Sequence, residues 1–326
     1  MPPPARAPPC PRWRPSNWAP PMPATKEDHA MSRLHLHSLL LLSALLASAC
    51  FDRGALPSAG AAEGGQTVER EIGGRSYLLS LPPGDSRQPR ALIVALHGGW
   101  GTGKNMQDIS GLDGPAGRAG FLVAYPDGIK RAWNAGSCCA QPMKRNIDDV
   151  GFIRAVVDDI AKTHNIDRKR VYGTGFSNGA MMLHRVACEA PGLFAAIAPV
   201  SGGPMFETCK SPKPVSALLI QGRADPRIPW DGGEFEGNYR PSIKSIVGQL
   251  GGRGQCASGE RELRKDSVAD CRSLGACAGG VEVSWCGLTG VGHQWAGGRT
   301  LLPGLLGQNT AQFNASEEIV RFFQRH

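Results

Sequence analysis

A serine flanked by two glycines, in Gly175-Phe176-Ser177-Asn178-Gly179, has the G-x-S-x-G spacing of a nucleophile elbow. A β-branched and aromatic run precedes it and a helix-like pattern follows it. In such a turn the serine hydroxyl stands clear of the backbone, and the glycines let strand and helix approach closely. The alternative is a glycine-rich loop that only turns the chain, but the strand-turn-helix context favours a reactive serine.

A reactive serine needs a base, and the base needs an acid that fixes its tautomer. In hydrolases with this elbow, the acid and then the histidine follow the serine along the chain. Three histidines follow Ser177. His184 lies within the elbow's own helix, and His326 is the terminal residue, where fraying is usual. His293, just beyond the last predicted strand, is therefore the predicted base.

Four aspartates lie between Ser177 and His293. Asp225 follows a buried apolar run at the carboxyl end of a predicted strand, where α/β sheets carry their functional loops. Asp266 and Asp270 lie in a polar stretch in which no strand is predicted. Asp225 is thus the predicted acid, and Asp231 is the alternative.

Two backbone N–H groups are expected to stabilise the oxyanion that forms when a serine attacks a carbonyl. The first is that of Asn178, the residue after the nucleophile. The second should come from the loop after an early strand, here His97-Gly98-Gly99-Trp100. We assign the Gly99 N–H as this second donor, with Gly98 and Trp100 as alternatives. The other interpretation is that the glycines only allow the chain to reverse direction and bind no oxyanion. We interpret His97 as structural.

Strands and helices alternate along the chain, which predicts a mainly parallel central sheet with helices on both faces. Residues 67–82 suggest a hairpin around Gly73-Gly74. The remaining strands are predicted from apolar runs at 91–96, 121–126, 171–176, 196–200, 216–220 and 281–285. Helices are expected at 148–164, after Ser177, and at 314–323, where Asn314 and Glu317 resemble a capping box.

The first 49 residues indicate a proline-rich extension and a secretory signal, with translation starting at Met31. The apolar segment ends at Ala47-Ser48-Ala49, directly before Cys50. Cys50 stands where bacterial lipoproteins carry a lipid, so both a lipid-anchored and a released protein are expected alternatives. Residues 50–69 then read as a flexible tether. Residues 70–326 form the predicted catalytic domain, with a cysteine-containing insertion at about 251–280.

The composition is that of an ordinary globular protein, with 41% hydrophobic and 20% charged residues. The formal charge is +8, but the basic residues are scattered, so no nucleic-acid partner is expected. A membrane is expected to be contacted only through a lipid on Cys50. The location is therefore predicted to be secreted or periplasmic, and nothing indicates the oligomeric state.

Ten cysteines in an exported chain predict disulfide bonds. Without Cys10 and Cys50, eight remain, and eight allow 105 connectivities. Cys138 and Cys139 either bond to each other or elsewhere, and a zinc site is the alternative. Our working assignment pairs Cys188 with Cys209, Cys256 with Cys286, and Cys271 with Cys277.

Taken together, these segments resemble the secreted polyhydroxybutyrate depolymerase and feruloyl esterase group of α/β-hydrolases. The resemblance covers residues 70–326 and implies the α/β-hydrolase fold and a triad of Ser177, Asp225 and His293. Besides the elbow, it is carried by Leu96-His97-Gly98-Gly99, Tyr125-Pro126-Asp127-Gly128, Trp133-Asn134-Ala135-Gly136 with Cys138-Cys139, Asp148-Asp149-Val150-Gly151-Phe152, Gly222-Arg223-Ala224-Asp225-Pro226-Arg227-Ile228-Pro229 and Gly292-His293-Gln294-Trp295.

The expected chemistry is hydrolysis of carboxylic esters through an acyl-enzyme, which requires no metal or cofactor. Trp100, Trp133 and Trp295 are candidates for an aromatic wall that holds a feruloyl group or a sugar ring. The substrates expected are feruloyl or acetyl esters of polysaccharides, or short hydroxyalkanoate esters. The alternatives are a serine peptidase with the same triad and a noncatalytic binding protein on the same fold.

Overall fold

The computed structural model describes residues 65–84, 87–209 and 213–326. The predicted extension and signal (1–49), the start at Met31, Cys50 and most of the tether lie outside the described residues. The domain boundaries drawn there remain predictions. The predicted catalytic domain, in contrast, is described almost throughout.

A ten-stranded sheet forms the centre of the described chain, in the order β1-β2-β4-β3-β5-β6-β7-β12-β11-β10. Six neighbouring strands, from β4 to β12 in this order, run parallel, and antiparallel pairs extend both edges. The strands are β1 (Gln66–Ile72), β2 (Arg75–Leu81), β3 (Arg90–Leu96), β4 (Leu122–Pro126), β5 (Ile166–Phe176), β6 (Ala196–Val200), β7 (Ser216–Gly222), β10 (Glu260–Lys265), β11 (Ala269–Leu274) and β12 (Val283–Leu288), with β8 (Gly233–Phe235) and β9 (Asn238–Arg240) forming a separate hairpin.

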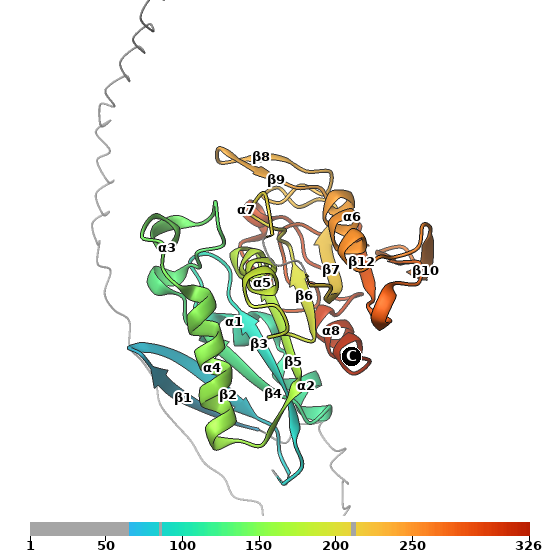
Figure 1. The fold of residues 1–326 in the computed structure, drawn as a ribbon. Coiled ribbons are helices and arrows are strands. Elements are labelled where there is room, and N and C mark those ends of the chain that lie inside the picture. The colour runs from blue at the N-terminus through green and yellow to red at the C-terminus, as the bar shows by residue number, and fades with distance from the viewer. Residues whose placement is uncertain (1–64, 85–86, 210–212) are drawn as a thin grey trace, which may run out of the picture. The chain divides into compact units, whose positions relative to one another are not determined.

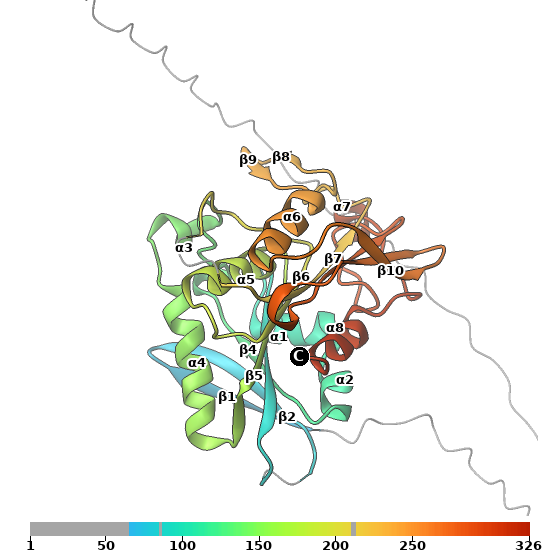
Figure 2. The ribbon, with the colours of Figure 1, turned by 45° about the vertical axis from the view of Figure 1, so that its right-hand side comes forward.

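Helices cover both faces of this sheet (Figures 1 and 2). Side chains of α4, α5 and α6 enter one hydrophobic core, and those of α1, α2 and α8 enter the other. None of the helices in the described part is long and apolar enough to cross a bilayer. The helices are α1 (Gly103–Ser110), α2 (Asp113–Arg118), α3 (Ala140–Lys144), α4 (Asp149–Thr163), α5 (Asn178–Glu189), α6 (Ile243–Arg253), α7 (Pro303–Leu306) and α8 (Ala315–Phe323).

This architecture confirms the predicted mainly parallel sheet between two helical layers. The β1–β2 hairpin turns at Gly73 and Gly74, which both have positive φ. Helix α8 begins as predicted, because the Asn314 side chain accepts a hydrogen bond from Glu317 N–H at 3.0 Å. The order of strands matters most for the site: β5, β6, β7 and β12 are neighbours, so their carboxyl ends share one edge.

The segment 251–280 differs from the expectation of a strandless insertion. It contains β10 and β11, which continue the central sheet beyond β12. β10 lacks an apolar pattern because it is an edge strand with charged side chains, Glu-Arg-Glu-Leu-Arg-Lys, most of them exposed. In β11, buried and half-buried residues alternate. Asp270 is therefore a strand residue rather than part of a loop.

The eight cysteines of the described residues form four disulfides, Cys138–Cys139, Cys188–Cys209, Cys256–Cys277 and Cys271–Cys286. The second is the pairing that we assigned. The assigned pairs Cys256–Cys286 and Cys271–Cys277 are wrong, because Cys271 and Cys286 lie directly opposite each other on β11 and β12. Cysteines held in disulfides are not the thiolate ligands that the zinc alternative requires.

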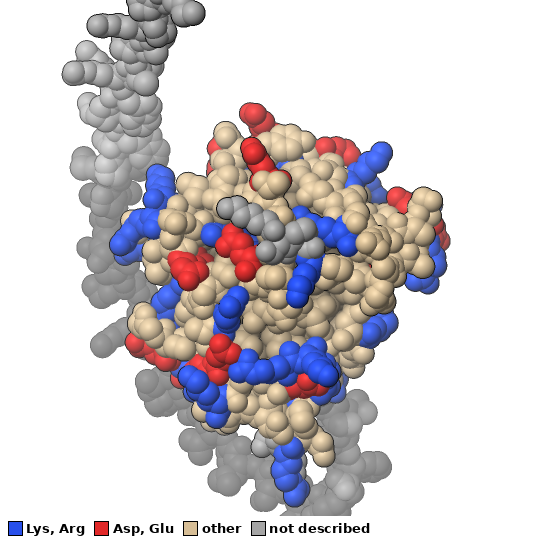
Figure 3. Space-filling model, viewed as in Figure 1, with Lys and Arg blue, Asp and Glu red and all other residues tan. Residues whose placement is uncertain are grey.

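Acidic and basic side chains are interspersed on the face that carries α4 and α5 (Figure 3). Several of them form ion pairs, including Arg70–Asp159 at 3.0 Å and Arg185–Glu189 at 2.7 Å. Such mixed, partly exposed pairs each contribute little to stability. This face is therefore typical of a solvated surface.

We expect Cys271→Ala/Cys286→Ala to lower the free energy of unfolding by about 3 kcal/mol, because the bond closes a 15-residue separation in the unfolded chain. Guanidinium unfolding of the oxidised parent and the double variant would measure this difference. Peptide mapping without reductant should recover Cys271 linked to Cys286. A fragment that links Cys256 to Cys286 would contradict the structure.

Candidate active site

Ser177 occupies a strained turn between β5 and α5. Its backbone has φ 53° and ψ −116°, a conformation that non-glycine residues rarely adopt. A Cβ at Gly175 would lie 2.8 Å from the Gly179 carbonyl carbon, and one at Gly179 would lie 2.2 Å from Leu96 O. Both glycines are therefore required for strand and helix to approach, as the elbow interpretation predicts.

His293 lies in the loop after β12, with its ring against the residue that precedes the serine. The ring centroids of His293 and Phe176 are 4.8 Å apart. His293 Nδ1 donates to Asp225 Oδ2 at 2.8 Å, and both side chains are almost completely buried. This bond fixes the tautomer that leaves Nε2 free to accept a proton.

The carboxylate of Asp225 is satisfied by four donors. Oδ1 accepts the backbone N–H groups of Arg227 and Ile228, each at 2.8 Å. Oδ2 accepts Gln221 Nε2–H at 3.1 Å in addition to the His293 imidazole. The structure therefore places the predicted acid Asp225 on His293, whereas the alternative Asp231 is exposed.

The reacting atoms of serine and histidine carry no other partners. Within the described ranges, neither Ser177 Oγ nor His293 Nε2 makes a hydrogen bond. In enzymes without bound substrate these bonds are often long and tighten only on binding. Among the described residues, the hydroxyl and the ring nitrogen are thus not engaged by another side chain or backbone group.

The loop after β3 lies beside the serine. A Cβ on Gly98 would be 3.3 Å from Ser177 Cβ, whereas one on Gly99 would meet open space. Trp100 N–H donates to Arg131 O at 2.8 Å, so this alternative oxyanion donor is already engaged. In the described chain, the N–H groups of Asn178, Gly98 and Gly99 have no acceptor, as an oxyanion hole requires, so Gly98 stays an alternative to Gly99.

His97 holds this loop from within the core. Its Nε2 accepts Gly128 N–H at 2.9 Å, so Nδ1 carries the proton and donates to Gly98 O at 2.7 Å. Burial lowers the pKa of His97 to about 4. His97 is thus a neutral positioning residue, as interpreted from the sequence.

Residues 75–232 match the protein family described as esterase PHB depolymerase. A putative esterase NocK of Nocardia uniformis subsp. tsuyamanensis is 32% identical over 274 residues, covering 76% of this chain and 78% of that protein. The chain belongs to this esterase family. Feruloyl esterase C of Emericella nidulans is also 32% identical, over 170 residues, covering 50% of this chain and 59% of that enzyme.

A solved structure of an acetyl xylan esterase from Aspergillus awamori superposes with a TM-score of 0.54 at 17% identity. The superposition covers 71% of this chain and 94% of that one. This likeness establishes the α/β-hydrolase fold. The family establishes that the protein is a carboxylic ester hydrolase, so the predicted resemblance and enzyme class are confirmed.

Sequence reasoning about this esterase missed a role for the side chain of Asn178. Its Oδ1 accepts Trp133 N–H at 2.7 Å, and its Nδ2 donates to Trp133 O at 3.1 Å. Trp133 Nε1 in turn donates to His97 O at 2.9 Å. A single residue therefore joins the elbow to the segment that supports the oxyanion loop. In the sequence, Asn178 lies in the elbow and Trp133 begins the Trp133-Asn134-Ala135-Gly136 motif, but nothing there indicates that the two residues make contact.

A buried ion pair supports the same segment. Arg75 Nη2 donates to Asp149 Oδ1 at 2.8 Å, and Asn134 N–H donates to Asp149 Oδ2 at 2.7 Å. The Arg75 guanidinium lies 3.5 Å from the centre of the Phe152 ring. Burial raises the pKa of Asp149 despite the opposing effect of Arg75. These contacts explain the Asp148-Asp149-Val150-Gly151-Phe152 motif as structural support.

Gln294, next to the predicted base His293, was also missed as a positioning residue. Its Nε2 donates to Leu301 O at 2.6 Å and to Gly307 O at 2.8 Å, and its Oε1 accepts Leu301 N–H at 2.9 Å. His293 N–H donates to Leu306 O at 2.6 Å. Gly292 N–H also donates to Gln308 O at 2.8 Å, so the loop that carries His293 is held to the segment around α7 by five hydrogen bonds.

The prediction that three tryptophans line a substrate pocket is wrong for Trp133 and Trp295. Trp133 is 0% exposed and Trp295 is 1% exposed, so neither lines an open pocket. Trp295 packs in the core and donates from Nε1 to Ser316 Oγ at 3.0 Å. Trp100 is 78% exposed, at positive φ, on the oxyanion loop. Only Trp100 remains a candidate for contact with substrate.

A metal site is not evident. Among the residues that the structure describes, no three His, Cys, Asp or Glu side chains lie close enough together to hold an ion.

We expect acid to destabilise the esterase through His97. Its pKa of about 4 in the folded protein lies below the ordinary 6.5, so the unfolded chain binds a proton at a higher pH. The stabilisation is complete above about pH 6.5 and is lost as the pH falls toward 4, by about 3 kcal/mol at most. Buried His184, whose pKa is also lowered to about 4, acts in the same direction.

Urea unfolding at pH 7, 6 and 5 should therefore show a steeper loss of stability in the parent than in His97→Gln. The difference between the two proteins isolates His97 from His184 and from the carboxylates. Equal pH dependence in parent and variant would contradict the assignment of a neutral, buried His97.

Proposed function

We propose that the protein hydrolyses carboxylic esters through a triad of Ser177, His293 and Asp225. The observation that carries this proposal is the buried Asp225–His293 hydrogen bond beside a strained serine turn. The three side chains follow β5, β12 and β7, whose carboxyl ends share one edge of the sheet. The esterase family to which the chain belongs supports the same chemistry.

In the proposed reaction, His293 Nε2 takes the proton of Ser177 as Oγ attacks the ester carbonyl carbon. The N–H groups of Asn178 and Gly99 stabilise the oxyanion, and the helix dipole of α5 adds to this effect. Collapse of the tetrahedral intermediate releases the alcohol, which receives its proton from the imidazolium. Water then attacks the acyl-enzyme with His293 again as base, which releases the acid and restores the serine.

The proposed substrates are acetyl or feruloyl esters of polysaccharides. The feruloyl esterase among the relatives supports this class, and the exposed Trp100 beside the oxyanion loop provides an aromatic contact. An open cavity of about 530 Å³ adjoins the same region and includes Gly128, the hydrogen-bond partner of His97, and Arg131, the partner of Trp100. Short hydroxyalkanoate esters are the alternative substrate class.

We also propose that the enzyme acts outside the cytoplasm, after removal of residues 1–49 and with or without a lipid on Cys50. The four disulfides support export, because such bonds persist in oxidising compartments. Palmitate labelling of the parent and of Cys50→Ala would distinguish an anchored from a released protein.

Ser177→Ala should reduce turnover of p-nitrophenyl acetate by about 10³-fold or more, because the nucleophile is removed. Ser245→Ala, an exposed serine on α6, is the matched control and should retain parental turnover. Matched p-nitrophenyl ester and p-nitroanilide substrates would also test the peptidase alternative. Parental activity in Ser177→Ala would refute the assignment of the nucleophile.

Asp225→Asn should lower kcat by about 10³- to 10⁴-fold, as loss of the orienting acid does in triad enzymes. The backbone donors Arg227 and Ile228 must face the new amide oxygen, so the NH₂ group points at His293 Nδ1. The imidazole must then carry its proton on Nε2 and cannot accept one from Ser177.

Asp231→Asn is the matched control for this substitution, because Asp231 is exposed on the same loop. Steady-state kinetics of both variants with p-nitrophenyl acetate would make the comparison. A loss of activity in Asp231→Asn with none in Asp225→Asn would assign the acid to Asp231 instead.

A further inference from the structure

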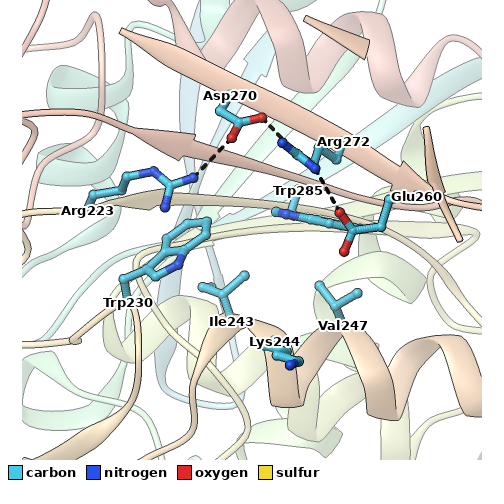
Figure 4. Close-up of a pocket in the computed structure, with 9 residues that line it drawn as sticks. All are labelled: Arg223, Trp230, Ile243, Lys244, Val247, Glu260, Asp270, Arg272 and Trp285. Atoms are coloured by element: carbon cyan, nitrogen blue, oxygen red, sulfur yellow. Dashed lines mark hydrogen bonds and ion pairs between the residues drawn. The ribbon is translucent and has the colours of Figure 1, made fainter. Parts of the chain in front are cut away.

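A second cavity, of about 300 Å³, lies between α6 and the strands β11 and β12 (Figure 4). We call it the Trp230 cavity. Its apolar walls are the half-buried Trp230, the buried Trp285 and the aliphatic side chains of Ile243 and Val247 from α6. None of its lining residues belongs to the proposed triad or oxyanion hole. It is therefore a separate site.

A chain of ion pairs forms the polar wall of the Trp230 cavity. Asp270 accepts from Arg223 at 3.3 Å and from Arg272 at 2.9 Å, and Arg272 also donates to Glu260 at 3.1 Å (Figure 4). Each arginine retains N–H groups that these bonds do not use, and each carboxylate retains lone pairs. The wall thus presents alternating donors and acceptors.

Gly287 of β12 lets the side chains of Trp230 and Arg223 lie directly against the sheet. A Cβ at this position of β12 would lie 2.7 Å from the Trp230 ring and 2.8 Å from the Arg223 guanidinium. The same guanidinium stacks 4.2 Å from the centre of the Trp230 ring. A glycine inside a strand often marks such a close approach. The indole is therefore held in place by the sheet below it and by Arg223.

We propose that the Trp230 cavity binds the pyranose rings of a neutral oligosaccharide. A sugar ring offers C–H groups to indole and aliphatic surfaces, and hydroxyls that both donate and accept. The lining carries five charged side chains, because Lys244 of α6 lies there together with the ion-paired Arg223, Arg272, Asp270 and Glu260. An apolar ligand would separate these groups from water, and an anionic ligand would meet Asp270 and Glu260. The volume lies at the lower end of ligand pockets, roughly 300 Å³, which suits one or two rings.

The position of the cavity connects it to the reaction. Arg223 and Trp230 belong to the segment after β7 that also carries Asp225. A saccharide held there would contact the same segment of chain that carries Asp225. The idea that this saccharide is part of the ester substrate rests on the proposed function. The binding of a saccharide in the Trp230 cavity does not rest on it.

Isothermal titration calorimetry with xylotetraose, which carries no ester, tests the binding directly. We expect the parent and Ser177→Ala to bind equally, with a dissociation constant of about 1 mM. Trp230→Ala should weaken binding at least about tenfold, because it removes the main ring surface. Glu260→Ala, an exposed rim position that should not affect folding, should weaken binding by a smaller factor. Tyr239→Ala removes an exposed aromatic side chain outside the cavity and should bind like the parent.

The proposal would be overturned if the parent bound no xylotetraose at about 10 mM, or if Trp230→Ala and Glu260→Ala both bound it like the parent. Competition by inorganic phosphate at similar concentrations would identify an anion site and overturn it as well. Because Ser177→Ala is included, loss of esterase activity cannot be mistaken for loss of saccharide binding.

Discussion

The buried carboxylate of Asp225 is the group on which the rest of the site depends. Its two oxygens accept four N–H donors, so the carboxylate is fixed in position and in orientation. One donor is the imidazole of His293, whose remaining nitrogen is the base in the proposed mechanism. A buried charge is tolerated only when it is paired in this way. Removing any of these partners would therefore disturb the base as well as the acid.

The serine side of the site is positioned by a second network, which contains no member of the proposed triad. The side chain of Asn178 binds both backbone groups of Trp133, and the indole of Trp133 binds the carbonyl of His97. His97 then donates to Gly98 O, so hydrogen bonds join the turn at Ser177 to the loop after β3. Preorganised donors of this kind require no rearrangement as charge develops on the substrate.

Much of this arrangement could be predicted because chain order and strand ends constrain it strongly. Few histidines follow Ser177, and Asp225 ends a clearly apolar strand, so elimination identified the pair that the structure joins. The strand β10 could not be predicted, because edge strands carry charges where a buried strand carries apolar residues. The pairing of Cys271 with Cys286 depends on that sheet extension, so it was also missed. Burial of Trp133 and Trp295 likewise depends on tertiary packing that composition does not reveal.

The central claim is that His293, oriented by Asp225, makes the Ser177 hydroxyl reactive. The most direct measurement is the rate and position of modification by a fluorophosphonate, determined by mass spectrometry of the labelled peptides. We predict one adduct, on Ser177, that forms at least about a hundredfold more slowly in His293→Ala. An adduct on another serine, or labelling of Ser177 at an unchanged rate in His293→Ala, would contradict it.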